Sequence, residues 1–305
     1  MVSTIQLPAQ IREIYPFRSR WMEVQGHRIH YVDEGADGGK PAVILLHGNP
    51  TWSFLYREII PRISHVCRAV APDYLGFGLS DKPRDERWYT LQNHIQAMTK
   101  FINGMGLSRV ILVVQDWGGP IGLSYALKYP DKVAGMLIMN TWAWPEPSKF
   151  HASVMPWRML HAPLVGAHLF LRKNALVERG LYLSTVRNRE RLRKGAVLNG
   201  YRLPFSFPLS RIGMLAFTRN IPLRPGDLNW ERMKGIKEGL RALPFPCRLL
   251  WGERDIVFPP SNAYLFQKLI PDCSSPSMIP DGGHFIQEDA PKEIVAEILA
   301  LLDQM

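Results

Sequence analysis

Val113-Val114-Gln115-Asp116-Trp117-Gly118-Gly119-Pro120 is the stretch around which this chain of 305 residues is organised. Residues 109–115 are mostly apolar and β-branched, which is typical of a strand buried on both faces. The two glycines allow close backbone approach, and the proline suits the first turn of a helix that extends to about Lys128. Asp116 is therefore predicted at a sharp strand-to-helix corner, with its carboxylate at the carboxyl edge of a sheet.

Strands and helices alternate on both sides of this corner. From runs of apolar residues and from alternation, we predict strands at 21–24, 27–33, 42–46, 68–71, 109–115, 133–139, 247–250 and about 276–279. Helical periodicity predicts helices at about 54–63, 90–104, 120–128, 261–270 and 291–302. Two strands followed by repeated strand–helix units indicate an α/β fold with a mostly parallel sheet.

The alternation stops between Trp142 and Leu240, where helical stretches, aromatic residues and scattered prolines occur without a convincing strand. An insertion at this point of the chain would lie over the carboxyl edge of the sheet. We therefore predict two domains: an α/β core formed by residues 1–141 and 241–305, and a helical cap formed by residues 142–240.

The net charge of +10 lies in the predicted cap, because residues 146–234 hold 16 Lys and Arg against 5 Asp and Glu. Nucleic acid or an anionic membrane surface could attract such a segment. The densest cluster, Arg187 to Lys194, lacks the interleaved aromatic residues that stack on bases, so a solvated helix face is the preferred interpretation. We expect no nucleic-acid and no membrane partner, whereas self-association of the basic, aromatic cap stays open.

Other features of the composition fit a reducing cytoplasmic environment. Three cysteines, Cys67, Cys247 and Cys273, form an odd set without close spacing, which suggests reduced thiols and no metal cluster. Residues 1–20 have no apolar segment of the secretory type, and no apolar run approaches the ~20 residues of a membrane span. The prediction is a cytoplasmic protein.

The corner at Asp116 has the pattern of a nucleophile elbow, a turn that usually carries serine between two small residues. Two more reactive side chains follow strands at the same predicted edge: Asp255 comes after the strand at 247–250, and His284 comes after the strand near 276–279. Ligand sites of open parallel sheets lie at this edge. The order nucleophile, acid, base is that of α/β-hydrolases, and we predict that Asp116, Asp255 and His284 form a catalytic triad.

An acid at the elbow changes the chemistry that the site can perform. A serine that attacked saturated carbon would form an ether, which water does not readily cleave. A carboxylate that attacks saturated carbon forms an alkyl ester, which a base-activated water can hydrolyse. Asp116 therefore predicts substitution at sp³ carbon, with His284 as the base and Asp255 orienting it. The backbone N–H groups of Asn49 and Trp117 are the predicted oxyanion hole.

The leaving group separates two candidate reactions, on alkyl halides and on epoxides. A departing halide needs donors that keep their protons, and the indole of Trp117 and the side-chain amide of Asn49 are such donors beside the nucleophile. An epoxide oxygen needs an acid, typically a tyrosine from the cap. Tyr182 and Tyr201 are the tyrosines between residues 142 and 240, and nothing in the sequence places them in the site.

The chain resembles the haloalkane dehalogenases of the α/β-hydrolase superfamily over nearly its whole length, least in the cap. The pairing of His-Gly-Asn-Pro with Asp-Trp-Gly is fairly specific, because epoxide hydrolases usually place other residues at Asn49 and Trp117, and Val114 also fits the family. The matching stretches are His47-Gly48-Asn49-Pro50-Thr51-Trp52-Ser53-Phe54, Gly78-Leu79-Ser80-Asp81-Lys82-Pro83, Val114-Gln115-Asp116-Trp117-Gly118-Gly119, Trp251-Gly252-Glu253-Arg254-Asp255 and Gly282-Gly283-His284.

The resemblance implies an eight-stranded, mostly parallel sheet with an inserted helical cap, and an enzyme that needs no metal and no organic cofactor. It implies a halogenated alkane as substrate, a halide ion as product, and Asn49 and Trp117 as the halide-binding pair. Part of the family carries its triad acid after the strand that here ends at Met139, but this chain has Asn140 there. Asp255 is then the acid, as in subfamily III. The cap aromatics expected to line the substrate cavity are Trp142, Trp144, Phe205 and Phe207.

Two other functions remain as alternatives at this stage. An epoxide hydrolase would use the same Asp116 nucleophile. A binding protein or a luciferase-like oxygenase on the same scaffold would not depend on Asp116. A serine esterase is disfavoured, because no serine occupies the elbow.

Overall fold

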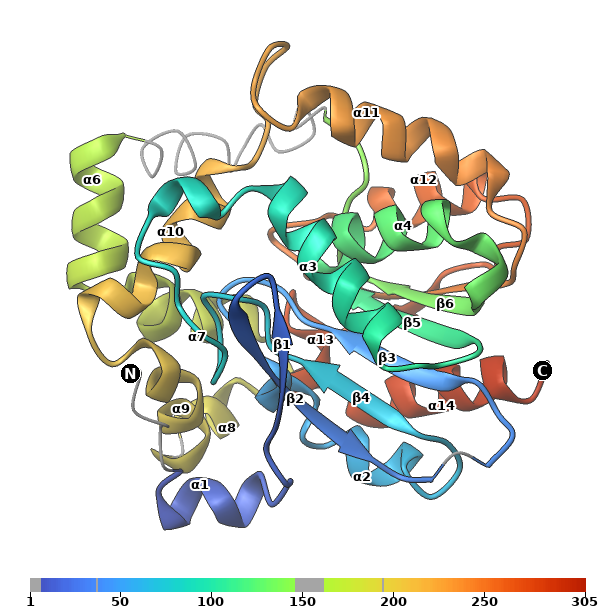
Figure 1. Cartoon of the computed structure of the whole chain (residues 1–305), viewed down its shortest axis with the longest axis horizontal. Coiled ribbons are helices and arrows are strands. Elements are labelled where there is room, and N and C mark those ends of the chain that lie inside the picture. The colour runs from blue at the N-terminus through green and yellow to red at the C-terminus, as the bar shows by residue number, and fades with distance from the viewer. Residues whose placement is uncertain (1–6, 37, 146–161, 194) are drawn as a thin grey trace.

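The computed structural model describes residues 7–36, 38–145, 162–193 and 195–305. Its centre is one eight-stranded sheet in the order β1-β2-β4-β3-β5-β6-β7-β8 (Figure 1). The pairs β1–β2 and β2–β4 are antiparallel and the other neighbours are parallel. The strands are β1 (Arg20–Val24), β2 (His27–Glu34), β3 (Ala42–Leu46), β4 (Ala69–Pro72), β5 (Val110–Gln115), β6 (Val133–Met139), β7 (Cys247–Gly252) and β8 (Ser277–Ile279). The predicted fold class is confirmed.

Helices cover both faces of this sheet. On one side α3 (Leu91–Gly104) packs against α4 (Gly118–Lys128), and on the other side α2 (Ile60–Ile63) packs against α14 (Pro291–Leu302) (Figure 1). The side chain of Thr90 caps α3 by accepting a hydrogen bond from the N–H of Asn93. Every residue of β3, β5 and β6 is buried, as expected of central strands between two helical layers.

The prediction of one continuous helix at 54–63 is wrong. A short 3₁₀ turn, Ser53–Tyr56, and the separate helix α2 replace one continuous helix. Pro61 explains the division, since it lacks an N–H and is tolerated only in a first helical turn, where it lies in α2. The sequence pattern also did not reveal the short helices α1 (Ala9–Ile14) and α13 (Ile286–Asp289).

The inserted segment is helical over the part that the structure describes, and no strand occurs in its residues 162–193 and 195–240. Most of it lies beyond one end of the sheet, whereas its last helix, α11 (Trp230–Gly239), packs against α4 (Figure 1). The helices are α6 (Pro163–Ala167), α7 (Leu181–Ser184), α8 (Arg189–Arg193), α9 (Gly195–Arg202), α10 (Ile212–Arg219) and α11 (Trp230–Gly239), with π-helical turns at His168–Arg172 and Leu176–Gly180.

The sequence suggested that the arginines of α8 and the preceding turn form a solvated helix face, but two of them form ion pairs. Arg187 pairs with Glu293 of α14 at 2.7 Å, and Arg191 forms an ion pair with Glu58, so both reach acidic residues of the core. The three cysteines are free thiols. Among the described residues, no helix is both long and apolar enough to cross a membrane.

Candidate active site

Asp116 lies between β5 and α4 in the left-handed backbone region, with φ at +50°. This conformation is strained for a residue other than glycine and persists only where the surroundings hold it. The N–H of Asp116 donates to the carbonyl of Asn140 at 3.1 Å, and its own carbonyl accepts from the N–H of Gly119 at 2.9 Å. The hydroxyl of Thr141 donates to the same carbonyl at 2.6 Å. The corner predicted from the sequence is thus held by the residues that follow β6.

Three glycines make this corner sterically accessible. A Cβ atom on Gly48 would lie 2.2 Å from the Oδ1 atom of Asp116, and one on Gly119 would lie 2.0 Å from the hydroxyl of Thr141. A Cβ on Gly118 would lie 2.4 Å from the carbonyl oxygen of Leu46. All three distances are far below van der Waals contact, so any larger residue would displace the nucleophile or its turn.

Asp116, Asp255 and His284 are brought together in space. The Nδ1 atom of His284 lies 3.1 Å from the Oδ2 atom of Asp255, and its Nε2 atom lies 3.7 Å from the Oδ2 atom of Asp116. All three side chains are nearly inaccessible to solvent. This is a nucleophile–base–acid arrangement, in which the distance between base and nucleophile exceeds the length of a hydrogen bond.

Asn140 supports the acid of this arrangement, a role that the sequence did not reveal. Its Nδ2 atom donates to Asp255 at 2.7 Å and to the carbonyl of Gly283 at 3.1 Å. The other carboxylate oxygen of Asp255 accepts from the N–H groups of Val257 and Phe258, at 2.7 and 3.0 Å. Asp255 is therefore fixed by three donors besides the imidazole.

Asp116 has fewer donors than Asp255. Its Oδ1 atom accepts from the backbone N–H of Asn49 at 2.7 Å. Burial raises the pKa of Asp116 above its usual value, although His284 and the backbone N–H groups of Asn49 and Trp117 act to lower it. Burial by itself would lower the pKa of His284, but Asp255 and then Asp116 raise it above its usual value.

The two predicted halide donors differ in their present contacts. The indole N–H of Trp117 has no hydrogen-bond partner within the described part of the chain, and this side chain is 2% exposed. The Nδ2 atom of Asn49 donates to the carbonyl of Met214 in α10 at 3.1 Å, with the hydroxyl of Thr218 at 3.5 Å. The side-chain amide of Asn49 is therefore directed at two acceptors of α10 in the cap.

Comparison with known proteins gives the family. Residues 41–291 match the model of the α/β hydrolase fold. Haloalkane dehalogenase 2 of Mycobacterium tuberculosis is 37% identical over 294 residues, which cover 94% of this chain and 96% of the relative. The chain belongs to the haloalkane dehalogenases.

Two further relatives extend this comparison. The crystal structure of haloalkane dehalogenase DbeA from Bradyrhizobium elkani superposes with a TM-score of 0.85 at 29% identity, covering 94% of this chain and 98% of that one. A protein of Shewanella oneidensis named cis-3-alkyl-4-alkyloxetan-2-one decarboxylase is 32% identical and covers 93% of this chain and 88% of its own length. The sequence resemblance to the dehalogenases is confirmed.

An aromatic wall connects the triad of this dehalogenase to the cap. Trp142, expected to line the cavity, stacks on Phe258 at 4.9 Å and meets the edge of Trp117 at 4.9 Å. Phe258 lies 5.5 Å from the ring of His284, and Phe217 of α10 stacks on Trp117 at 4.8 Å. The sequence reasoning missed Phe217 and Phe258. The position of Phe258, three residues after Asp255, was a usable signal, whereas nothing local marks Phe217.

The other three residues expected to line the cavity contact other parts of the structure. Trp144 packs on Phe266 of α12 (Ser261–Leu269) at 5.0 Å, which is a core contact. Phe205 is fully buried against Phe77 at 6.0 Å, whereas the side chain of Phe207 is 53% exposed on the surface. None of the three contacts a triad side chain in the described part of the structure.

The two cap tyrosines that an epoxide hydrolase would need are engaged away from the triad. The hydroxyl of Tyr201 donates to the buried carboxylate of Glu288. The hydroxyl of Tyr182 lies 3.5 Å from Glu190, and its ring lies under the guanidinium of Arg189. Within the described residues, the triad therefore has no tyrosine acid from the cap.

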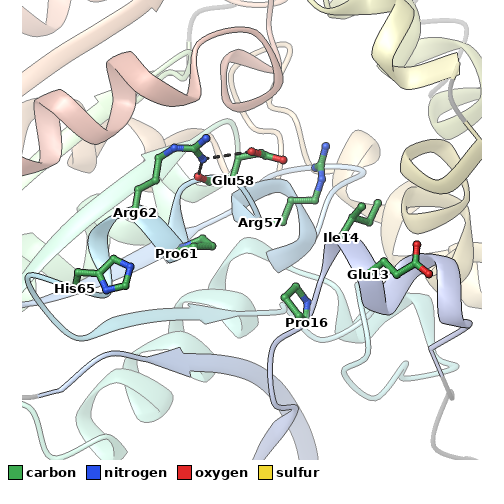
Figure 2. Close-up of a pocket in the computed structure, with 8 residues that line it drawn as sticks. All are labelled: Glu13, Ile14, Pro16, Arg57, Glu58, Pro61, Arg62 and His65. Atoms are coloured by element: carbon green, nitrogen blue, oxygen red, sulfur yellow. Dashed lines mark hydrogen bonds and ion pairs between the residues drawn. The ribbon is translucent and has the colours of Figure 1, made fainter.

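A surface pocket of about 570 Å³ lies apart from this site, between α1 and the segment that leads into α2 (Figure 2). Figure 2 shows the ion pair between Glu58 and Arg62 at its rim, 3.3 Å long. Its lining carries both charge signs, and none of the triad residues belongs to it. The pocket is lined by residues that include Glu13, Ile14, Arg57, Glu58, Arg62 and His65.

Proposed function

We propose that this dehalogenase cleaves the carbon–halogen bond through a covalent alkyl ester on Asp116, releasing an alcohol, a halide ion and a proton. The observation that carries the proposal is the arrangement around the Asp116 carboxylate. One of its oxygens accepts the Asn49 N–H at 2.7 Å, while the other faces the imidazole of His284 at 3.7 Å. The two oxygens therefore stand in different environments, as the two halves of the reaction require.

In the first half, the Oδ2 atom of Asp116 attacks the saturated carbon that carries the halogen. A carbon–oxygen bond forms, the carbon–halogen bond breaks, and the halogen leaves with the bonding electrons as a halide ion. The low exposure of Asp116 removes water that would otherwise solvate and weaken the carboxylate nucleophile. The N–H donors of the Trp117 indole and the Asn49 amide are proposed to hold the departing halide.

In the second half, water attacks the Cγ carbon of the ester. Its proton passes to the Nε2 atom of His284, and Asp255 holds the Nδ1–H and stabilises the imidazolium that results. The negative oxygen of the tetrahedral intermediate lies where Oδ1 now accepts from Asn49, with the Trp117 N–H as second donor. Collapse of the intermediate expels the alkoxide, which takes the proton from the Nε2 atom of His284 and leaves as alcohol, and the Asp116 carboxyl group then releases the second proton of the water.

The atoms balance with water alone, so we propose that neither a metal ion nor an organic cofactor takes part. The three free cysteines support a reducing, cytoplasmic location. Exposed apolar side chains of the cap, including Leu164, Phe207 and Leu209, support self-association as a further expectation.

A variant without the base tests the covalent ester directly. His284→Phe retains Asp116, so incubation with 1-bromobutane should release one halide per protein and stop. The intact mass should then increase by one butyl group, and peptide mapping should place it on Asp116. A variant that releases halide without gaining mass would contradict the covalent ester.

A second candidate reaction is the decarboxylation of a β-lactone, favoured by the 32% identity to the oxetanone decarboxylase. Asp116 could attack the saturated ring carbon bonded to the ring oxygen, which opens the ring and leaves a carboxylate on the neighbouring carbon. Breaking the bond to that carboxylate releases CO₂, forms the C=C bond and expels Asp116. No halide donor is needed, consistent with the Asn49 amide being partly engaged by Met214.

Parallel assays with a cis-3,4-dialkyloxetan-2-one and with 1-bromobutane separate the two reactions. Alkene and CO₂ from the lactone would establish the second reaction, whereas halide and alcohol from the bromide would establish the first. Both need Asp116, so only the products discriminate.

A further inference from the structure

Gln115, the residue before the nucleophile, contacts the catalytic histidine from the side opposite Asp255. It is the last residue of β5, and its side chain is fully buried. Its Nε2 atom lies 3.2 Å from the Nε2 atom of His284 and also donates to the carbonyl oxygen of His284 at 3.2 Å. One side-chain amide thus touches both the ring and the backbone of the base.

The orientation of this amide is set by its surroundings. Rotating it by 180° would bring the Oε1 atom against the carbonyl of His284, which is also an acceptor, so the present orientation is the one that hydrogen-bonds this carbonyl. The Oε1 atom is buried without a partner in the described structure. A buried acceptor without a donor lowers the stability of a fold. The retention of Gln115 here therefore suggests that its amide N–H groups serve the site.

The hydrogen bonds at the other end of the ring define what Gln115 meets. Asp255 accepts from the Nδ1 atom of His284 at 3.1 Å, so that nitrogen carries a proton. In the neutral ring the Nε2 atom then has a free electron pair, and the Gln115 N–H points a donor at it. If the Nε2 atom became protonated, two N–H groups would face each other at this distance.

We propose that Gln115 is a positioning residue that holds His284 neutral by donating a hydrogen bond to the Nε2 atom, the atom that must accept the proton of the hydrolytic water. This inference rests on the proposed role of His284 as base. Gln115 keeps the ring in the required tautomer before substrate arrives. Water approaching the ester must share or replace this hydrogen bond.

Charged groups around His284 act in the opposite sense. Asp116 and Asp255 both favour the imidazolium, and their combined effect raises the pKa of His284 despite burial. From the following helix, Asp289 accepts from the N–H of Gly283 at 2.8 Å. The ring neighbours Phe258 and Phe285 are uncharged. Among the described contacts to the imidazole, Gln115 is the one that favours the neutral ring, and its effect gains weight when alkylation removes the charge of Asp116.

The test is Gln115→Met, which keeps a side chain of similar volume and removes the amide. Gln287→Met is the matched control, because Gln287 is also buried, also has an unpartnered Oε1 atom, and donates to Tyr56 instead. The pKa of His284 is read by NMR in protein labelled with ¹³C at histidine Cε1, with His284→Phe used to assign the resonance. The pH dependence of ester hydrolysis is measured in single-turnover experiments with 1-bromobutane.

Gln115→Met should raise the pKa of His284 by about half to one unit, since one hydrogen bond to the neutral form is lost. The acid limb of ester hydrolysis should move to higher pH by the same amount, while Gln287→Met leaves both unchanged. An unchanged pKa in Gln115→Met, or equal shifts in both variants, would overturn the proposal.

Two additions keep this test independent of other failures. If Gln115→Met does not fold, Gln115→Leu takes its place with the same expected shift. The NMR measurement needs no turnover, so a protein that releases no halide would disprove the proposed reaction without deciding the role of Gln115, which the pKa alone decides.

Discussion

The carboxyl edge of the sheet and the cap are built by different kinds of contact. At the edge, each reactive group follows a strand end within a few residues, and the lack of a side chain at Gly48 lets that segment approach Asp116. The cap is attached to the core by long-range polar contacts: the carbonyl of Ser184 accepts from the N–H of His284 at 2.7 Å, and Asp289 accepts from the N–H of Val186 at 2.9 Å. The reactive groups are therefore visible in the local sequence, whereas coverage of the site depends on contacts between residues far apart in sequence.

This contrast predicts that changes at the edge abolish turnover while leaving the fold intact. Asp116→Ala should reduce halide release by roughly 10³-fold or more, because no other described group can form the ester. Halide release from 1-bromobutane and circular dichroism are measured together. Asp281→Ala is the control, since this aspartate lies three residues before His284 but has an exposed side chain paired with Arg254. Appreciable halide release by Asp116→Ala would remove the basis of the mechanism.

Changes at the attachment of the cap should act on stability. Arg57 and Glu288 form a fully buried pair with contacts of 2.6 and 2.8 Å, and Tyr201 of the cap donates to the same carboxylate. Burial would raise the pKa of Glu288, but Arg57 and Tyr201 hold it below its usual value. Glu288→Gln leaves Arg57 buried without a counter-charge, which should lower the free energy of unfolding by about 3 kcal/mol.

An exposed ion pair between cap and core provides the control for this effect. Glu293 pairs with Arg187 at 2.7 Å, and their side chains are 38% and 37% exposed. Glu293→Gln should cost less than about 1 kcal/mol in urea denaturation at pH 7, because solvent screens the pair. Equal losses in Glu288→Gln and Glu293→Gln would show that burial of the pair does not matter. Because the pKa of Glu288 is depressed, its contribution should be present at neutral pH and disappear as the pH falls through that pKa.

The same division explains what could be predicted from the sequence. The strands, the elbow and the order of Asp116, Asp255 and His284 were accessible, because apolar runs, glycines and strand ends are local signals. The sequence showed Asn140 only as an asparagine at a position where part of the family has its triad acid. Its hydrogen bond to Asp255 could not be predicted, because the two residues are 115 positions apart in the chain.

The cap was less predictable for a physical reason. Aromatic side chains satisfy a core and a cavity equally well, so composition did not separate Trp142, which touches Trp117, from Trp144, which packs on Phe266. The stacking of Phe217 on Trp117 depends on how α10 meets the core, and Phe207 is exposed just before the 3₁₀ turn that precedes α10. The break of the helix at Pro61 was visible in the sequence, but the turn before it has no comparable signal.

The smallest expected effect is a change in thermal stability, which should differ in sign between Asp116 and Asp255. Burial raises the pKa of Asp116, so its ionised form destabilises the folded protein relative to the protonated form at neutral pH. Asp116→Asn imitates the protonated form and should raise Tm at pH 7 by roughly 2 °C, although halide release is lost. The gain in Tm should shrink as the pH falls, because the Asp116 carboxyl group of the unaltered protein then becomes protonated as well.

Asp255→Asn should have the opposite sign, measured by the same calorimetry. Its carboxylate accepts from Asn140, Val257 and Phe258, and an amide offers only one acceptor oxygen to these donors. A lower Tm for Asp255→Asn and a higher Tm for Asp116→Asn would mean that the site holds one carboxylate for support and exposes the other to reaction at a cost in stability. Equal signs would mean that the donors around Asp255 contribute no more to the fold than those around Asp116.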